Sequence, residues 1–188
     1  MDDTLSRYKR AADQLGEKIR KVAADQWTNA TPCAEWDVRA LVNHLVAETY
    51  WIAPLFEGKT IAEVGDRYDG DVLGDDPVAA WDDSLASALA QIERPGAMQR
   101  TVHLSFGDFE GEEYLNQLLL DLVVHGWDLA IGISADPTID PTLAGPVLEW
   151  FLPNAEGWRK AGALGPAVEV PADADAATRL IGLSGRQP

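Results

Sequence analysis

Residues 118–131, LLLDLVVHGWDLAI, constrain the fold more than any other part of the sequence. Eleven of these fourteen positions suit a protein interior, but Asp121, His125 and Asp128 interrupt them. The three polar residues are spaced i, i+4 and i+7, so a helix places them on one face. Burying a charge is costly unless the charge is paired or bound. The stretch therefore predicts a buried helix whose polar face meets an ion or a partner side chain.

The periodicity of the chain predicts an all-α fold with four main helices. Their expected spans are residues 4–26, 38–57, 77–93 and 110–132. Asp37 suits the N-cap of the second helix and Gly58 its end. Pro77 suits the first turn of the third helix, and Pro95-Gly96 its end. A shorter fifth helix is expected within 137–158, weakened by Pro146 and Pro153.

The connections between these helices contain little regular structure. Residues 58–76 show no sustained period, and so long a connection in a compact domain is typical of a lid or a site wall. Residues 99–109 favour an extended stretch, near 99–105, that ends in a Gly-Asp turn. A second short extended piece and a last turn of helix are expected near the C-terminus.

The organisation of the chain predicts one domain over residues 1–188, because no repeat, low-complexity tract or linker divides it. Four helices and a long crossover connection are typical of a helix bundle. Bundles build metal sites from side chains on facing helices.

The charge and cysteine content narrow the function classes. The net charge is −16, from 31 acidic and 15 basic residues, which argues against nucleic acid and against anionic membrane surfaces as partners. Cys33 is the only cysteine, which excludes an intrachain disulfide and fits a reducing compartment. The first ten residues lack the apolar region of a signal peptide, and no apolar run approaches the ~18–20 residues of a membrane span. We expect a cytoplasmic protein.

Three histidines occur in the sequence, and two of them fall on apolar helices. His44 lies in ALVNHLVAE, and His125 follows Asp121 by one helical turn. Two imidazoles and one carboxylate suit zinc, nickel or ferrous iron, and three protein ligands leave coordination positions open for water or substrate. Calcium and magnesium prefer shells made only of oxygen atoms. His44, Asp121 and His125 are therefore the candidate metal ligands.

Simpler interpretations of the same residues stay open at this point. Asp121 and His125 are compatible with an ion pair alone. Asp128 can pair with Arg39 or cap a turn. Glu48 and Asp128 can orient the imidazoles from behind, or they can be solvated.

The other candidate reactive residues carry weaker signals. Cys33 follows a proline near a helix start, which can lower a thiol pKa, but a small buried hydrophobe is the better interpretation. His103 is expected on a strand face. Ser105 and Ser184 lack an evident base, so a catalytic triad is unsupported. The seven tryptophans are expected mainly in the core. The sequence contains no glycine-rich phosphate loop.

Two segments, TPCAEWDVRALVNHLVAE and TVHLSFGDFEGEEYLNQLLLDLVVHGWDLA, resemble the DinB-like metal-binding proteins. The branch that they resemble is the actinobacterial one around mycothiol-dependent maleylpyruvate isomerase, and the C-terminal tail is similar to that of its short members. The resemblance implies a four-helix bundle with a divalent metal at one end. It also implies His44 and His125 as ligands, with Asp121 at a carboxylate position where the isomerase has Glu.

The resemblance implies a reaction class as well. In the isomerase the metal activates a low-molecular-weight thiol, which suits zinc. The chain lacks the isomerase's extra C-terminal α/β domain, so the expected activity is a metal-dependent thiol transferase or isomerase-like enzyme that uses mycothiol on a small electrophile. The alternative is a non-catalytic metal-binding bundle with a structural or stress-related role. Family members often pair, which makes a homodimer an expectation too.

Overall fold

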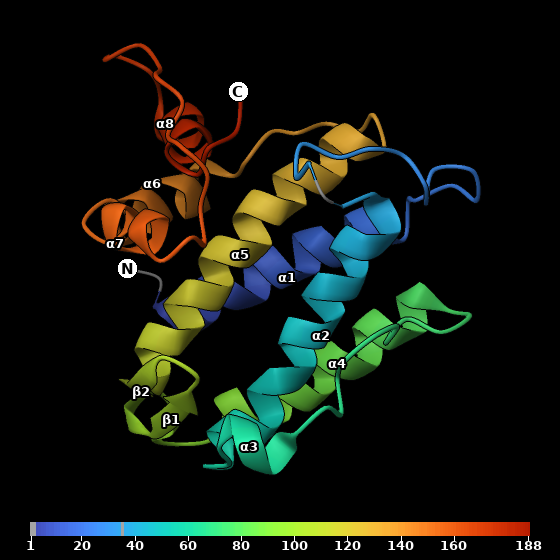
Figure 1. Ribbon diagram of the computed structural model, residues 1–188, viewed down its shortest axis with the longest axis vertical. Helices are drawn as coiled ribbons and strands as arrows, with labels where there is room; N and C mark the ends of the chain where they lie inside the picture. The colour runs from blue at the N-terminus through green and yellow to red at the C-terminus, as the bar shows by residue number, and fades with distance from the viewer. Residues whose placement is uncertain (1–2, 35) are drawn as a thin grey trace.

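The computed structural model describes residues 3–34 and 36–188 and is mostly helical, which confirms the all-α prediction (Figure 1). Within these residues no helix has the length and apolar content needed to cross a membrane. The elements in chain order are α1 (Thr4–Ile19), α2 (Val38–Phe56), α3 (Ile61–Val64), α4 (Pro77–Ile92), η1 (Ala97–Gln99), β1 (Thr101–Leu104), β2 (Gly107–Glu110), α5 (Gly111–Gly132), α6 (Pro141–Phe151), α7 (Ala155–Lys160) and α8 (Ala176–Leu183).

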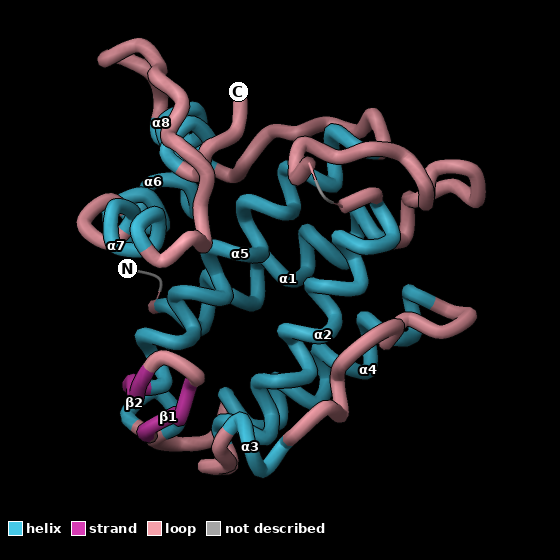
Figure 2. Tube along the Cα trace, viewed as in Figure 1, coloured by secondary structure: helices cyan, strands magenta, loops and turns pink. Residues whose placement is uncertain are grey.

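The four long helices α1, α2, α4 and α5 form a bundle. Helix α1 packs against α4 and α5, and α2 packs against the same two helices (Figure 2). The faces that meet are apolar, and Leu15, Leu41, Trp81 and Leu115 are almost completely buried between them. Burial of side chains of this size contributes roughly 1.5–3 kcal/mol each. The bundle therefore holds α2 and α5, which carry the candidate ligands, in fixed positions.

The predicted ends of α2 and α4 are confirmed. The Asp37 carboxylate accepts a hydrogen bond from the Ala40 backbone N–H at 2.8 Å, as an N-cap does. Gly58 follows the last residues of α2 with φ of 88°, a conformation that side chains other than glycine rarely adopt. Pro77 occupies the first turn of α4 behind the N-cap Asp76.

Helix α1 ends at Ile19, well before the predicted residue 26. The chain then leaves the helix, and side chains of the following residues donate hydrogen bonds to carbonyls at the C-terminal end of α5. The Gln26 amide donates to the Ile133 carbonyl at 2.9 Å, and the Asn29 amide donates to the Gly132 carbonyl at 3.0 Å. These carbonyls have no partner within their own helix. A loop ending at Trp36 then leads into α2, and its residue 35 lies outside the described part of the chain.

The crossover segment 58–76 is more ordered than predicted. It contains the short helix α3, which a capping box between Thr60 and Glu63 begins. The segment is fastened to α2 at two places. Asn43 donates to the Gly70 carbonyl at 2.8 Å, and Arg39 forms an ion pair with Asp71 at 2.7 Å.

The extended stretch predicted near 99–105 is confirmed in part, as the first strand of an antiparallel hairpin. In this hairpin Leu104 of β1 pairs with Gly107 of β2, so the turn is made by Ser105 and Phe106. The prediction of a Gly-Asp turn is therefore wrong. Gly107 belongs to the strand and takes a φ of 145°, which glycine tolerates next to a tight turn.

Residues 133–188, which we call the C-terminal segment, form a small helical layer beside α5 (Figure 1). Pro146 lies within α6, and Pro153 lies between α6 and α7, so the expected fifth helix is two helices. Helix α6 packs against α5 and α8. Helix α8 is longer than the predicted single turn. The expected extended piece before it forms no strand in the described chain, although the Val168 N–H donates to the Gly182 carbonyl at 2.9 Å.

Candidate metal centre

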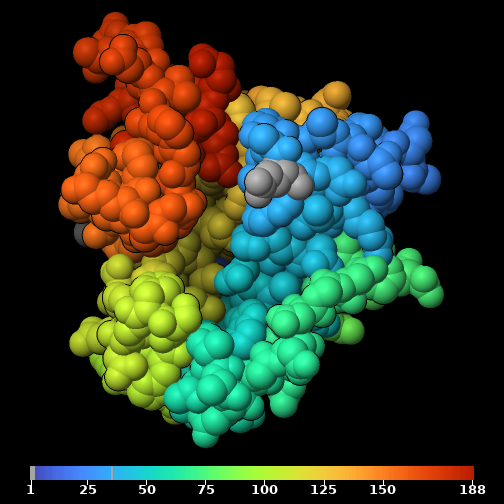
Figure 3. Space-filling view, in the orientation of Figure 1, coloured from blue at the N-terminus to red at the C-terminus, as the bar shows by residue number. Residues whose placement is uncertain are grey.

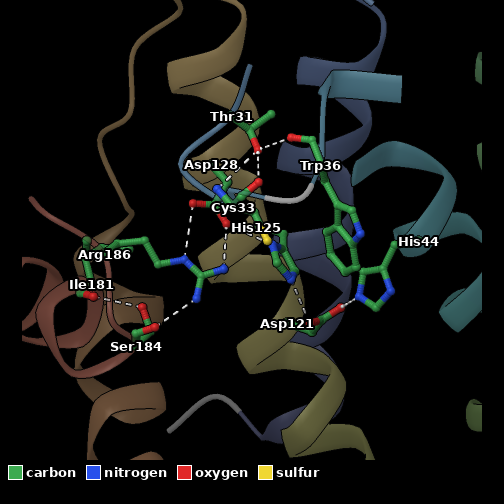
Figure 4. Close-up of polar contacts among 10 residues, drawn as sticks. All are labelled: Thr31, Cys33, Trp36, His44, Asp121, His125, Asp128, Ile181, Ser184 and Arg186. Carbon is green, nitrogen blue, oxygen red and sulfur yellow. Dashed lines mark hydrogen bonds and ion pairs between the residues drawn. The ribbon is translucent and has the colours of Figure 1, made fainter. Parts of the chain in front are cut away.

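The three candidate ligands meet between α2 and α5 (Figure 4). His44 comes from α2, and Asp121 and His125 lie one turn apart on α5. The Nε2 atom of His44 lies 3.1 Å from Oδ2 of Asp121, and the Nε2 atom of His125 lies 3.3 Å from Oδ1. One ligand atom from each residue lies within 4.8 Å of the other two. The spacing on α5 and the packing of α2 thus bring together the residues that the sequence singles out.

The residue before the N-cap of α2 completes one wall of this cluster. The Trp36 ring centroid lies 4.5 Å from that of His44 and 5.5 Å from that of His125. The Thr31 hydroxyl donates to the Trp36 carbonyl at 2.8 Å and fixes the loop that carries the indole. The sequence predicts core packing for most tryptophans, and this one instead packs on both imidazoles.

Asp128 contacts His125 from behind. The Asp128 Oδ2 atom lies 2.8 Å from Nδ1 of His125, and its side chain is completely buried. A carboxylate in this position accepts a hydrogen bond from the Nδ1–H group and leaves Nε2 to face the cluster. Asp128 therefore orients an imidazole, which is one of the two roles that the sequence left open for it.

The cation that neutralises Asp128 is Arg186, from the chain just after α8. Its Nη2 and Nε atoms lie 2.8 Å and 3.3 Å from the two carboxylate oxygens. The pairing of Asp128 with Arg39 considered from the sequence is wrong, because Arg39 reaches Asp71 instead. Nothing local in the sequence marks Arg186. The only signal is general: an aspartate inside an apolar helix requires a positive partner.

The exposure of the cluster is uneven. The side chains of Asp121 and His44 are 29% and 25% exposed, whereas that of His125 is 9% exposed. His125 is thus held inside the protein by Asp128, and the other two groups face open space. A ligand can reach the cluster from the side of Asp121 and His44.

The groups of the cluster shift one another's pKa values. Burial raises the pKa of Asp121, but the imidazoles of His125 and His44 outweigh it and hold this pKa well below its usual range. Burial lowers the pKa of His125, but the carboxylates of Asp121 and Asp128 raise it to about 9. Burial, and then the Asp121 charge, raises the pKa of Glu48, although His44 opposes this. Without an ion, a proton on His125 therefore balances the carboxylates.

Two cavities adjoin the cluster, and Gln117, Asp121 and Trp158 line both of them. The larger measures about 640 Å³ and lies between α5, the loop before α2 and the C-terminal segment. The smaller measures about 350 Å³ and lies between α2, α5 and the hairpin. Figure 3 shows the corresponding hollow, with α5 at its floor. Ile61 of the crossover segment lines the smaller cavity, as expected for a site wall.

The remaining candidates lie in other surroundings. His103 lies on β1, where its Nδ1 atom is 2.8 Å from Oδ1 of Asp108, and it takes no part in the cluster. Cys33 is half-buried and lines the larger cavity rather than the core. The Ser184 hydroxyl donates to the Ile181 carbonyl at 2.8 Å.

The donor set fits a borderline divalent ion. Two imidazole nitrogens and a carboxylate oxygen are ligands that zinc, nickel and ferrous iron accept. A carboxylate behind a ligating imidazole also recurs at such sites, because it fixes the tautomer and the ring orientation. His44, Asp121 and His125 could hold such an ion, with Asp128 supporting His125.

Comparisons with known proteins identify the family of the chain. Residues 8–130 match the sequence model of the family described as Mycothiol maleylpyruvate isomerase N-terminal domain. Two uncharacterized proteins of Mycobacterium tuberculosis, from strains CDC 1551 / Oshkosh and H37Rv, are each 31% identical over 146 residues. Those alignments cover 76% of this chain and 74% of each relative. No solved structure matches the chain.

Proposed function

Because the chain belongs to the family of the mycothiol maleylpyruvate isomerase N-terminal domain, we propose that it is a metal-dependent thiol transferase. The co-substrate is a low-molecular-weight thiol of the mycothiol type, and the acceptor is a small electrophile. We assign zinc as the metal, with nickel or ferrous iron as alternatives. His44, Asp121 and His125 are the ligands.

The observation that carries this proposal is the convergence of three donor atoms at a cavity edge. The atoms lie within 4.8 Å of one another, and the Asp121 side chain is 29% exposed. A catalytic metal site has three protein ligands and an open position, whereas a structural zinc site is closed by four. Within residues 3–34 and 36–188 the cluster has three members, which favours the enzyme over a purely structural bundle.

The chemistry follows from this arrangement. A divalent ion lowers the pKa of a thiol bound to it and so supplies a thiolate at neutral pH. Asp128 contacts Nδ1 of His125 and leaves its Nε2 atom facing the cluster, where it would bind the ion, and Trp36 packs against both imidazole rings. The cavity beside His125 and Asp121 is large enough for the body of the thiol, since ligand sites typically measure roughly 300–1,000 Å³.

The first test is a zinc titration by competition with a chromophoric chelator. We expect His44→Ala and His125→Ala to weaken zinc binding by about 100-fold or more, because each removes one of three ligands. His103→Ala is the matched control, because His103 pairs with Asp108 outside the cluster. Equal zinc affinity in all three variants would refute the ligand assignment.

The second test measures thiol binding. Mycothiol is titrated calorimetrically into zinc-loaded protein and into metal-free protein. We expect binding only with zinc present, and we expect Asp121→Ala to abolish it together with zinc. If zinc binds but mycothiol binds equally with and without the metal, the site holds a metal and the transferase proposal fails.

A further inference from the structure

The smaller of the two cavities beside the cluster, which we call the α2–hairpin cavity, contains a buried phenol. Tyr114 lies on α5 two turns before Asp121, so the two side chains share one face of the helix, and both line this cavity. Tyr114 is only 5% exposed, and its ring packs against that of Phe56, with centroids 6.1 Å apart. The phenol is therefore held in place by its packing and enclosed by the protein.

The fold makes no use of the Tyr114 hydroxyl group. Across residues 3–34 and 36–188 this hydroxyl has no hydrogen-bond partner. The hydroxyl of Tyr8 is also unpartnered, but it is completely enclosed in the core, whereas that of Tyr114 belongs to a residue that lines a cavity. Buried polar groups in proteins are nearly always paired. An unpaired donor that a cavity can reach therefore indicates a ligand that brings an acceptor.

Other polar side chains of this cavity depend less on a ligand. Gln117 is half-buried and Ser105 is exposed, so solvent reaches both of them. His44 and Asp121 already contact each other in the candidate metal centre, where Nε2 lies 3.1 Å from Oδ2. When a ligand displaces water from the cavity, a donor as enclosed as Tyr114 loses most if the ligand offers it no acceptor.

The Tyr114 hydroxyl keeps its proton at neutral pH. A phenol has an ordinary pKa of about 10. Burial, and then the charge of Glu48, raises the pKa of Tyr114 further. A divalent ion at the cluster would offset part of the carboxylate charge, but a phenol with its ordinary pKa is already protonated at neutral pH. Tyr114 is therefore a donor, and the group that fits it is an acceptor such as a carbonyl or ether oxygen.

We propose that the electrophile binds in the α2–hairpin cavity, and that Tyr114 selects it by donating a hydrogen bond to one of its oxygen atoms. The inference deepens the proposed function and rests on it, because the electrophile is the second substrate of the thiol transferase. His44 and Asp121 border the same cavity, so a molecule in it meets the metal centre as well as Tyr114. Seven residues of helix separate Tyr114 from Asp121, a rise of about 10 Å. The acceptor oxygen is therefore remote from the reacting carbon, and Tyr114 determines specificity rather than taking part in the chemistry.

The test compares 1-indanone with indane, which has the same ring system but lacks the carbonyl oxygen. Each is titrated calorimetrically into zinc-loaded protein and into metal-free protein, and circular dichroism checks the fold of every variant. Tyr114→Phe should reduce the ratio of indanone affinity to indane affinity about fivefold to tenfold in both forms, because one hydrogen bond is lost. Damage to the shape of the cavity would instead weaken both probes and leave the ratio unchanged.

Tyr50→Phe is the matched control for the loss of a hydroxyl group. Tyr50 stacks on Tyr68, with ring centroids 5.3 Å apart, and it lines neither of the two cavities beside the cluster. This variant should leave the affinity ratio unchanged.

A second pair of variants locates the probe. Ser105 and Ala163 are exposed small residues that line the α2–hairpin cavity and the larger cavity, respectively. Ser105→Trp should abolish binding of 1-indanone, and Ala163→Trp should leave it unchanged. The inference is overturned if 1-indanone does not bind, if Tyr114→Phe leaves the affinity ratio unchanged, or if either tryptophan variant behaves otherwise. Because the titrations contain no thiol and include a metal-free series, their failure is distinct from failure of the transferase proposal.

Discussion

The helix bundle and the C-terminal segment contribute different things to one site. The bundle contains all three candidate ligands, and the family match ends at residue 130, close to the end of α5. The C-terminal segment contributes none of the three candidate ligands that the described chain brings together. It adds one wall of the larger cavity and the arginine that neutralises Asp128.

The difference teaches that the candidate metal ligands and one wall of the larger cavity come from separate parts of the chain. Side chains from two bundle helices, α2 and α5, form the candidate metal centre. The shape and charge of the larger cavity depend on residues outside the family match, including Trp158 and Arg186. The two regions are joined at the contact between Asp128 and Arg186, so variants at this contact test whether the division is real.

The largest effect on stability and zinc affinity is expected for Asp128→Ala, which removes the bundle's side of the ion pair between Asp128 and Arg186. Arg186 would be left 13% exposed with an unpaired charge, and breaking a buried pair in this way costs about 3–5 kcal/mol. Zinc affinity should fall about 10- to 100-fold, because His125 loses its orienting carboxylate. Urea denaturation and zinc competition measure the two effects.

Asp71→Ala is the matched control for this variant. It removes an aspartate–arginine pair whose side chains are 58% and 39% exposed, so the free energy of unfolding should change by less than about 1 kcal/mol. Equal losses in both variants would mean that the Asp128 contact is no more important than a surface ion pair.

The next effect is a dependence on pH in the metal-free protein. The pKa of His125 is raised to about 9 in the folded state, so its contribution to stability is complete below its unfolded pKa of about 6.5. That contribution, about 3 kcal/mol, should be lost as pH rises from about 6.5 to 9. Zinc displaces the same proton, so zinc affinity should increase over the same range.

Two variants check this pH dependence. His125→Gln should flatten the plot of unfolding free energy against pH, and His103→Gln should preserve it, since His103 is outside the cluster. A profile that is already flat in the unmodified protein would contradict the account of His125.

A smaller effect is expected for Arg186→Met, which removes the C-terminal segment's side of the same ion pair. Asp128 keeps its hydrogen bond to His125, so we expect stability to fall by about 2 kcal/mol and zinc affinity by about tenfold. Arg179→Met, on the exposed side of α8, is the control from the same segment. If zinc affinity is the same in both variants, the C-terminal segment does not influence the metal site.

The smallest effect on the metal is expected for Trp158→Ala. Trp158 lines both cavities, but its ring packs edge-on against Trp150 and Phe151 and not against the candidate ligands. Zinc affinity should stay within about threefold of the original, because the variant removes no contact to a candidate ligand. A large loss of zinc affinity would show that the two regions are not separable.

The fold is predictable from the sequence where a pattern is local. The apolar periods and caps predict α2, α4 and α5 closely, because Asp37, Gly58 and Pro77 act on their own helices. The end of α1 is not predictable in this way, since Gln26 leaves the helix to reach a carbonyl 107 residues away. The hairpin turn is also missed, because Gly107 suits a strand flank as well as a turn.

In the candidate site, too, local patterns are predictable from the sequence and long-range contacts are not. His44, Asp121 and His125 can be selected from the sequence because each places a polar group on a strongly apolar helix. Their support cannot be selected in this way. Arg186 lies 58 residues from Asp128 in the sequence. In the sequence Trp36 resembles the other tryptophans expected in the core, and only the structure shows its ring packed on the imidazole of His44. Long-range pairing leaves no periodic signature.

The packing of Trp36 on both imidazoles gives the chain an intrinsic optical reporter. Indole emission responds to a neighbouring positive charge, and here the indole lies 4.5 Å and 5.5 Å from the imidazoles of His44 and His125, the two candidate metal ligands. The difference in emission between the unmodified protein and Trp36→Phe should therefore report occupancy of the centre. Loading and release could then be timed in a stopped-flow instrument without any added dye.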